Sequence, residues 1–333
     1  MKPFILDRYG KKQALRLGDM PEPVPGPDDV VVEVEAAGLN LLDSKLRNGE
    51  FKPILPYKTP FVLGHDLAGT IVKVGAKVRR FKPGDTVYAR PRDGQIGAFA
   101  ERIAVKEADL APKPANLSMA EAASIPLVGL TAWQVLVERA QIKPRQKVLI
   151  HAGSGGVGTF AIQLAKHLGA TVATTASAAN AAMVKNLGAD VVIDYRSQKF
   201  EEELSGYDIV LNSLDATTLE KSLKILKPGG KLISISGPPD PAFARVQGLN
   251  VVLRLVLSVM SAGIRRKAKR VGVDYSFLFM RADGGQLSRI TKLIEDGTIR
   301  PVVDRTFPLE KLNDAFAYIE TGRAKGKVVA TLK

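Results

Sequence analysis

Cysteine is absent from the 333-residue sequence. Its absence excludes disulfides, thiolate nucleophiles and metal sites that depend on thiolate ligands. The first residues, Met1–Asp7, also lack the apolar segment of a secretory signal, so we expect a cytoplasmic protein. With 45% apolar and 25% charged residues, the chain has the composition of a globular protein, and its length suggests two domains.

Acidic residues are scarce relative to basic ones: 34 Asp and Glu stand against 48 Lys and Arg, which gives a net charge of +14. Such an excess can attract nucleic acid, an anionic membrane or an anionic ligand. Because most of the basic residues are scattered, we expect a basic enzyme with no nucleic-acid partner. The exception is a basic cluster at Arg265–Arg270.

The most informative motif is a glycine-rich turn. A short apolar run, Lys147–Ile150, precedes it, and apolar residues at helical spacing follow it until Gly169. Strand, glycine turn and helix together form the context in which Gly-x-Gly-x-x-Gly binds a dinucleotide. The glycines let the backbone approach a pyrophosphate, which rests on free N–H groups at the helix start. The expected cofactor contacts are Gly153, Ser154, Gly155, Gly156, Val157 and Gly158.

The pattern of predicted secondary structure changes near residue 117. Before it, short β-branched runs between Gly and Pro turns predict a compact β-rich domain. After it, Ser118 and Glu121 resemble a capping box, and apolar strands then alternate with helices, which predicts a parallel sheet covered on both faces. The expected strands are 171–175, 191–194, 208–213 and 231–236, and the expected helices 130–139, 178–187 and 219–226. The end of the chain, with a helix at 309–320 and a strand at 327–332, is expected to return to the first domain.

Several further strings are spread over the chain: Gly38–Asp43, Leu63–Gly69, Phe81–Val87, Leu130–Trp133, Leu226–Lys231 and Glu320–Val329. Together with the glycine turn, they resemble the zinc-independent branch of the medium-chain dehydrogenase/reductases, the quinone and enone oxidoreductases. Within this branch, Tyr275–Met280 resembles the reticulon-4-interacting protein and plant enone oxidoreductase groups. The resemblance implies an α/β fold and a homodimer. It places a GroES-like, β-rich catalytic domain at 1–122, completed by 300–333, and a Rossmann domain with a doubly wound parallel sheet at 123–299.

Zinc ligands are missing at the positions where zinc-dependent members of the family carry them. The resemblance places Asn40, His65 and Leu127 at these positions. One imidazole cannot make the three-ligand catalytic site that zinc needs, so no metal is expected.

A carboxylate that would bind the ribose hydroxyls of NADH is missing from the residues after the second sheet strand. Its absence removes the repulsion that a 2′-phosphate would meet, so NADPH is the expected cofactor. The resemblance implies that Ser177 and Tyr195 bind this phosphate, with Asn180 where relatives carry a lysine; Arg196 or Lys185 could compensate. By position, the resemblance adds further cofactor-binding residues: Thr131, Asn212, Leu214, Ser236, Gly237, Phe277, Leu278, Phe279 and Lys327.

The absence of zinc also restricts the chemistry. Alcohol oxidation loses its alkoxide stabilisation, whereas hydride transfer to an electron-poor acceptor needs no Lewis acid. We therefore expect an NADPH-dependent reductase of quinones or α,β-unsaturated carbonyls, with Asn40 beside the reacting ring. Tyr57, Asp43 and Tyr88 are candidate proton donors, and water is another source. An enoyl-thioester reductase and a nucleotide- or RNA-binding regulatory protein on the same fold stay open as alternatives.

The apolar stretch Leu249–Met260 leads into the basic cluster. It is too short, and Arg254 lies too centrally, for a membrane span. Two interpretations stay open. The stretch is either a buried helix near the active site or a dimer contact, or it is an apolar substrate wall whose basic end touches an anionic membrane surface.

Overall fold

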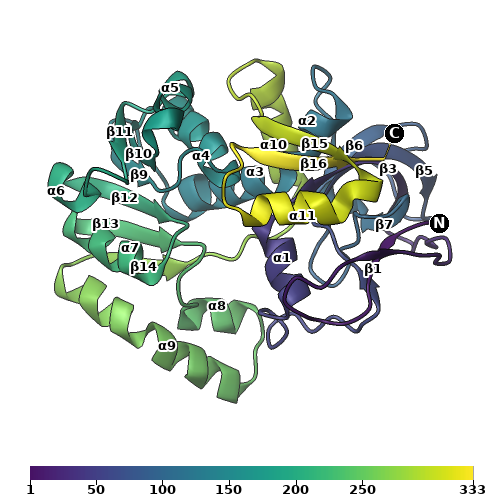
Figure 1. Ribbon diagram of the computed structural model, residues 1–333, viewed down its shortest axis with the longest axis horizontal. Coiled ribbons are helices and arrows are strands. Elements are labelled where there is room, and N and C mark those ends of the chain that lie inside the picture. The colour runs from purple at the N-terminus through teal and green to yellow at the C-terminus, as the bar shows by residue number, and fades with distance from the viewer. Residues whose placement is uncertain (333) are drawn as a thin grey trace. The chain divides into compact units, whose positions relative to one another are not determined.

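The computed structural model describes residues 1–332, and its backbone contacts divide the chain into two compact units (Figure 1). Unit 1 comprises Met1–Leu130 and Arg281–Lys333, and unit 2 comprises Thr131–Met280. The boundaries expected from the sequence, after residue 122 and before residue 300, differ from this division. The difference at the second boundary has a clear cause: helix α10 (Gly284–Glu295) packs on unit 1, where the Tyr88 hydroxyl donates to the carbonyl of Leu287 at 2.9 Å.

Unit 1 is built on a seven-stranded sheet in the order β15-β16-β3-β5-β6-β8, in which β7 also pairs with β3. The strands are β3 (Asp29–Leu39), β5 (Asp66–Val74), β6 (Thr86–Ala89), β7 (Arg102–Lys106), β8 (Leu110–Pro112), β15 (Val303–Pro308) and β16 (Lys327–Thr331). A three-stranded sheet combines β2 (Arg16–Leu17), β1 (Phe4–Leu6) and β4 (Phe61–Val62). In Figure 1 the yellow β16 lies beside β3 from the early part of the chain, so the expected return of the C-terminal residues is confirmed.

The helices of unit 1 begin where the sequence supplies a cap. Helix α2 (Met119–Ala123) has the expected capping box: Glu121 N donates to Ser118 Oγ, and Ser118 N donates to Glu121 Oε2. The remaining helices are α1 (Leu41–Asn48), α11 (Leu312–Glu320) and α3 (Pro126–Trp133), and α3 runs across the boundary between the units.

Unit 2 is built on a six-stranded sheet in the order β11-β10-β9-β12-β13-β14, in which all neighbours are parallel. The strands are β9 (Lys147–Ile150), β10 (Thr171–Ala176), β11 (Val191–Asp194), β12 (Tyr207–Asn212), β13 (Leu226–Ser234) and β14 (Asp274–Phe277). The chain starts in the centre at β9, runs outward to β11, and returns to the other side at β12. In a doubly wound sheet, ligands bind at the carboxyl ends of the strands where this reversal occurs, which here is between β9 and β12.

The helices of unit 2 are α4 (Gly156–His167), α5 (Ala181–Asn186), α6 (Phe200–Glu203), α7 (Ala216–Lys221), α8 (Pro241–Val246) and α9 (Val251–Arg270). Two helices expected from the sequence have other limits. The helix expected at 219–226 ends earlier, because Leu226 already begins strand β13. The helix expected at 130–139 begins earlier, in α3, and continues as a π-helix at Gln134–Arg139.

Helix α9 lies outside the edge strand β14, with α8 beside it (Figure 1). Within the chain α9 is mostly exposed, with only Leu257, Ser261, Ile264 and Ala268 buried, so it is not a buried helix of this unit; the dimer contact and the membrane contact stay predictions. The reason is its position at the sheet edge, which leaves packing partners on one side alone. Within residues 1–332, no helix meets the length and hydropathy that a membrane span requires.

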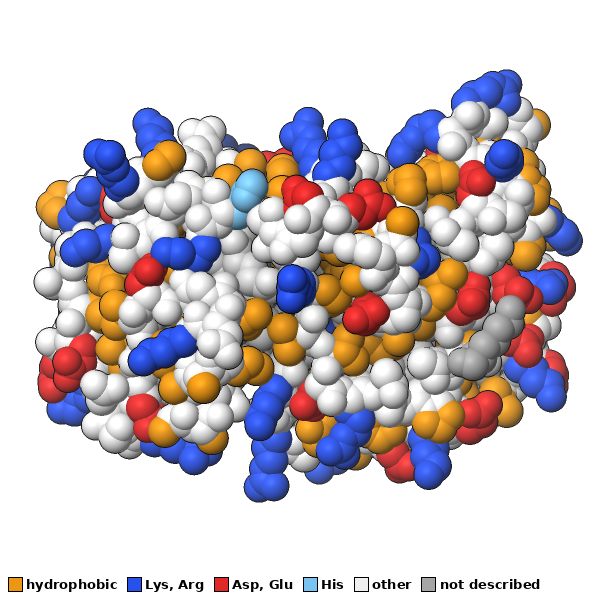
Figure 2. All heavy atoms as spheres, turned by 90° about the horizontal axis from the view of Figure 1, so that it is seen from above, with side chains coloured by type: hydrophobic (Ala, Val, Ile, Leu, Met, Phe, Trp, Pro, Cys, Tyr) orange, Lys and Arg blue, Asp and Glu red, His pale blue; other side chains and the backbone are white. Residues whose placement is uncertain are grey.

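Basic side chains are scattered on the face that Figure 2 shows, singly or in small groups among neutral and apolar surface. This distribution agrees with the scattered basic residues of the sequence.

Candidate cofactor and active site

The glycine turn of unit 2 joins β9 to α4, and at two of its glycines the surrounding atoms leave no room for a side chain. A Cβ atom on Gly153 would lie 2.0 Å from Thr174 Oγ1, and one on Gly158 would lie 2.3 Å from the carbonyl oxygen of Ala152. Gly155 is the N-cap of α4, and no side chain caps this helix start. The first helical hydrogen bond of α4 is donated by the backbone N of Thr159 to the Gly155 carbonyl at 2.9 Å. The backbone N–H groups of residues 156–158 come before it and have no acceptor in the preceding turn of a helix. A close backbone with uncapped amides fits the pyrophosphate of a dinucleotide.

The residues expected at the 2′-phosphate lie at one edge of the sheet. Strands β10 and β11 pair in parallel with Ala176 opposite Asp194, so Ser177 and Tyr195 follow adjacent strand ends. Ser177 is buried, whereas the Tyr195 side chain is 60% exposed. The guanidinium of Arg196 lies 5.8 Å from the centre of the Tyr195 ring. Asn180 is held close by, since its backbone N donates to the Ser177 carbonyl at 2.9 Å. The fold therefore brings these residues together, and their binding of a phosphate stays a prediction.

A second group of expected contacts lies at the ends of β12 and β13. Asn212 is fully buried, and its Oδ1 accepts from the hydroxyls of Ser234 at 3.1 Å and Ser236 at 3.3 Å. Among residues 1–332 its Nδ2 has no hydrogen-bond partner. The Ser236 hydroxyl also lies 2.6 Å from the Leu214 carbonyl, and Gly237 N donates to Ser234 Oγ at 2.7 Å. A buried amide donor at a strand end is suited to a polar ligand atom.

The last expected contacts in unit 2 follow or end β14. The Phe277 ring packs edge-on against Phe243 with 5.1 Å between centroids, and the Phe279 ring lies 6.0 Å from the same side chain. Leu278 is buried, and its backbone N donates to the Ser234 carbonyl. Thr131, at the start of unit 2, is also buried.

His151, between strand β9 and the glycine turn, is a residue of this site that the sequence analysis did not single out. Its Nδ1 lies 3.3 Å from Thr175 Oγ1, its Nε2 lies 3.0 Å from Ser222 Oγ, and its ring packs edge-on against Phe200. Thr175 Oγ1 also accepts from the backbone N of Ala152, so His151 is linked to the glycine turn. Burial lowers the pKa of His151 to about 4, although the nearby Asp215 opposes this shift. The signal in the sequence was a histidine directly after the last strand residue.

A neutral, buried His151 makes unit 2 sensitive to acid. In the unfolded chain the His151 imidazole binds a proton below about pH 6.5, whereas in the folded chain it binds one only below about pH 4. The free energy of unfolding is therefore highest above pH 6.5 and falls as the pH is lowered from 6.5 toward 4. We expect the wild type to lose up to about 3 kcal/mol more than His151→Asn between pH 7 and pH 4, in urea unfolding of unit 2. His167→Asn, at an exposed histidine, is the control. Equal pH dependence of wild type and His151→Asn would contradict this account.

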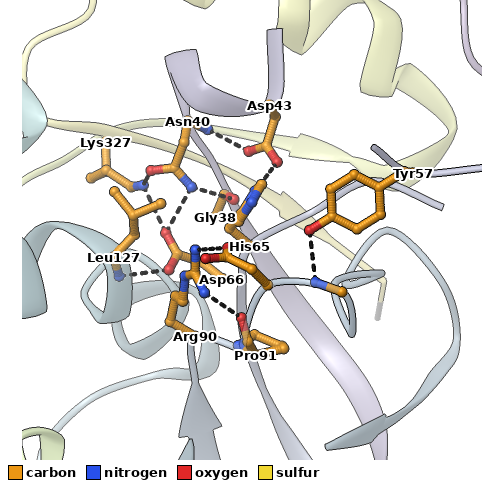
Figure 3. A network of polar contacts seen from close by, with 12 residues as sticks. Gly38, Asn40, Asp43, Tyr57, His65, Asp66, Arg90, Pro91, Leu127 and Lys327 are labelled. Carbon is orange, nitrogen blue, oxygen red and sulfur yellow. Dashed lines mark hydrogen bonds and ion pairs between the residues drawn. The ribbon is translucent and has the colours of Figure 1, made fainter. Parts of the chain in front are cut away.

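Unit 1 holds a buried polar network that joins β16, β5 and the start of α1 (Figure 3). Lys327 Nζ donates to Asn40 Oδ1 at 2.5 Å and to Asp66 Oδ2 at 2.9 Å. Asp66 Oδ2 also accepts from Asn40 Nδ2 at 3.0 Å, and Asp66 Oδ1 accepts from the backbone N of Leu127 at 2.7 Å. Lys327 was predicted to bind the cofactor, and Asn40 to lie beside the reacting ring. Both predictions stand untested, while the structure shows that the two side chains bond each other.

His65 and Asp43 extend this network. His65 Nδ1 lies 2.6 Å from Asp43 Oδ1, and Asp43 Oδ2 accepts from the backbone N of Asn40 at 3.0 Å, which caps α1. Both side chains are fully buried, and among residues 1–332 His65 Nε2 has no hydrogen-bond partner.

The two candidate tyrosines are engaged elsewhere in unit 1. The Tyr57 hydroxyl accepts from the backbone N of Gly94 at 2.9 Å, its ring stacks on Phe61, and burial raises its pKa to about 12 (Figure 3). The Tyr88 hydroxyl lies in the core against Thr291, and burial raises its pKa further. Neither hydroxyl bonds to Asn40 or Lys327, and both hold their protons tightly at neutral pH.

The residues that the resemblance places at the ligand positions of zinc-dependent relatives, Asn40, His65 and Leu127, do not form a zinc site. Leu127 offers no side-chain donor, the Asn40 amide is bonded to Asp66 and Lys327, and the ammonium of Lys327 already neutralises Asp66. Over the described range 1–332, no group of three His, Asp or Glu side chains is placed to hold a metal.

The sequence and the fold are similar to those of known dehydrogenases and oxidoreductases. Residues 26–115 match an alcohol dehydrogenase GroES-like domain, and residues 187–329 match a zinc-binding dehydrogenase domain. The chain is 34% identical to the mitochondrial NAD(P)H oxidoreductase RTN4IP1 of Danio rerio, over 100% of this chain and 91% of that protein. It is 36% identical to the chloroplastic NADPH-dependent alkenal/one oxidoreductase of Arabidopsis thaliana, over 99% of this chain and 79% of that protein. The solved structure of the quinone oxidoreductase from Coxiella burnetii is similar, with a TM-score of 0.88 at 30% identity, over 100% of this chain and 99% of that one. The chain therefore belongs to the medium-chain dehydrogenase/reductase family, in its quinone and enone oxidoreductase branch, and is an NAD(P)-dependent oxidoreductase.

Proposed function

We propose that the protein is a zinc-independent, NADPH-dependent reductase of quinones or α,β-unsaturated carbonyls. The observation that supports the proposal is the Asn40–Asp66–Lys327 network, which engages Asn40, one of the residues that the resemblance places at the ligand positions of zinc-dependent relatives. Without a Lewis acid, the reaction needs an acceptor that stabilises the incoming negative charge itself, as quinones and conjugated carbonyls do.

Different residues of unit 2 bind different parts of the cofactor. When bound, NADPH supplies the hydride. The uncapped amides of α4 hold the pyrophosphate, and Ser177 and Tyr195 hold the 2′-phosphate. Arg196, beside Tyr195, supplies the positive charge that the lysine of relatives provides. A proton from water or from a side chain completes the two-electron reduction of the acceptor.

Cofactor preference is tested at Ser177. A hydrogen bond to a charged phosphate contributes roughly 1.5–3 kcal/mol, so Ser177→Ala should weaken NADPH binding by about tenfold or more and leave NADH binding nearly unchanged. Titration of cofactor fluorescence measures both affinities. Ser205→Ala, at an exposed loop serine of the same unit, is the matched control. Equal losses for NADPH and NADH would show that Ser177 does not touch the phosphate.

The reaction itself is tested by a turnover panel with NADPH. A short-chain quinone, an alkenal, a crotonyl thioester and a primary alcohol with NADP⁺ are compared, with and without a strong chelator. Fastest turnover with quinone or alkenal, unaffected by the chelator, supports the proposal. A clear preference for the thioester would favour an enoyl-thioester reductase instead. Chelator-sensitive alcohol oxidation would overturn the assignment.

A further inference from the structure

The first half of helix α9 presents an apolar stripe to solvent. Its members recur in adjacent pairs every four residues, which places them on one face of a helix, and each is 46–77% exposed. They are Val251, Val252, Leu255, Val256, Val259 and Met260. The buried residues of α9, Leu257, Ser261, Ile264 and Ala268, lie on the opposite face. The stripe is therefore not the packing face of the helix.

The second half of the helix adds positive charge without acidic residues. No Asp or Glu occurs in 251–270, whereas this helix carries six basic residues: Arg254, Arg265, Arg266, Lys267, Lys269 and Arg270. Lys267 pairs with Glu220 at 2.7 Å, and Arg265 bonds to Ser258 and Ser261. Within residues 1–332, Arg266, Lys269 and Arg270 take part in no ion pair, and all three are exposed. Helical spacing puts Arg266 and Arg270 on the same side as the apolar stripe.

We propose that α9 docks the protein on an anionic lipid surface, with the stripe at the acyl boundary and the basic end among the headgroups. An apolar face with an adjoining basic surface is the composition of helices that lie in the plane of a membrane interface. Charge decides between this occupant and a second copy of the chain. A second copy of the chain has a net charge of +14 and would on balance repel Arg266, Lys269 and Arg270, whereas an anionic lipid surface carries only charge that attracts them. The proposal does not depend on the reaction catalysed.

The test is co-sedimentation with vesicles of phosphatidylcholine, with and without about one-third phosphatidylserine, at low and at higher salt. We expect wild type to bind the anionic vesicles at low salt and to be released as salt screens the charges. The triple variant Arg266→Gln, Lys269→Gln, Arg270→Gln should bind about a hundredfold more weakly. The triple variant Val252→Ser, Leu255→Ser, Val259→Ser should also lose binding, because it removes the apolar contact.

A matched control separates local docking from net charge. Lys73→Gln, Lys77→Gln, Lys82→Gln removes as many exposed basic charges from unit 1 and should leave vesicle binding unchanged. Thermal unfolding verifies that every variant is folded. No binding by wild type at low salt, equal losses in both basic triples, or full binding by the apolar triple would each overturn the proposal. It would also be overturned if sedimentation equilibrium showed a dimer that the apolar triple dissociates, because a second copy would then cover the stripe.

Discussion

Gly158→Ala is expected to reduce the affinity for NADPH by at least about a hundredfold. An added Cβ would lie 2.3 Å from the Ala152 carbonyl oxygen and 2.6 Å from the Gly153 Cα, and both are backbone atoms that cannot rotate away. The turn must therefore open and carry the α4 amides away from the phosphates. Loss of two hydrogen bonds to a charged group, at roughly 1.5–3 kcal/mol each, corresponds to this factor. Isothermal titration calorimetry measures it directly.

The control for this prediction is Gly263→Ala, in helix α9 of the same unit. A Cβ at Gly263 has no atom within 4 Å, so the variant should bind NADPH normally and be more stable by up to about 1 kcal/mol. Normal NADPH affinity in a folded Gly158→Ala protein would remove the basis for placing the pyrophosphate at this turn.

Lys327→Met is expected to destabilise unit 1 by roughly 3–5 kcal/mol, because it leaves the buried carboxylate of Asp66 without its cation. Asp66 is fully buried and Lys327 is only 5% exposed, so water cannot replace the lost ammonium. The remaining bonds to Asp66, from Asn40 and from the backbone of Leu127, carry no compensating charge. Chemical denaturation of wild type and variant gives the difference.

The double variant Lys327→Met, Asp66→Asn tests the cause. Removing both charges should restore a large part of the lost stability, since the penalty belongs to the unpaired carboxylate. Lys199→Met breaks an ion pair with Glu202 in which both side chains are 64% exposed, and it should change stability little. If Lys327→Met is as mild as Lys199→Met, the network does not carry a buried charge pair.

Local sequence predicted the alternation of strands and helices in the Rossmann unit, although not its edge strand β14 or the limits of every helix. Strand β11 was predicted with its observed limits, and the glycine turn was predicted between β9 and α4, because alternating apolar strands and helices leave a periodic signal and glycines mark the turn. Ser177 and Tyr195 were implied by the family resemblance; the fold places each directly after the end of a strand, and their contact with a phosphate stays a prediction. The resemblance to the medium-chain family, which the comparisons confirm, extended this interpretation to the whole chain.

Only the tertiary structure decided which polar residues meet. Asn40, Asp66 and Lys327 are far apart in the chain, and only the pairing of β3 with β5 and β16 brings them together. The tertiary structure also decided that the apolar half of α9 is exposed, because a helical pattern shows which residues share a face but not whether a partner covers it. Periodicity is a local property, whereas burial and polar pairing depend on which segments pack against each other, and they therefore had to be taken from the fold.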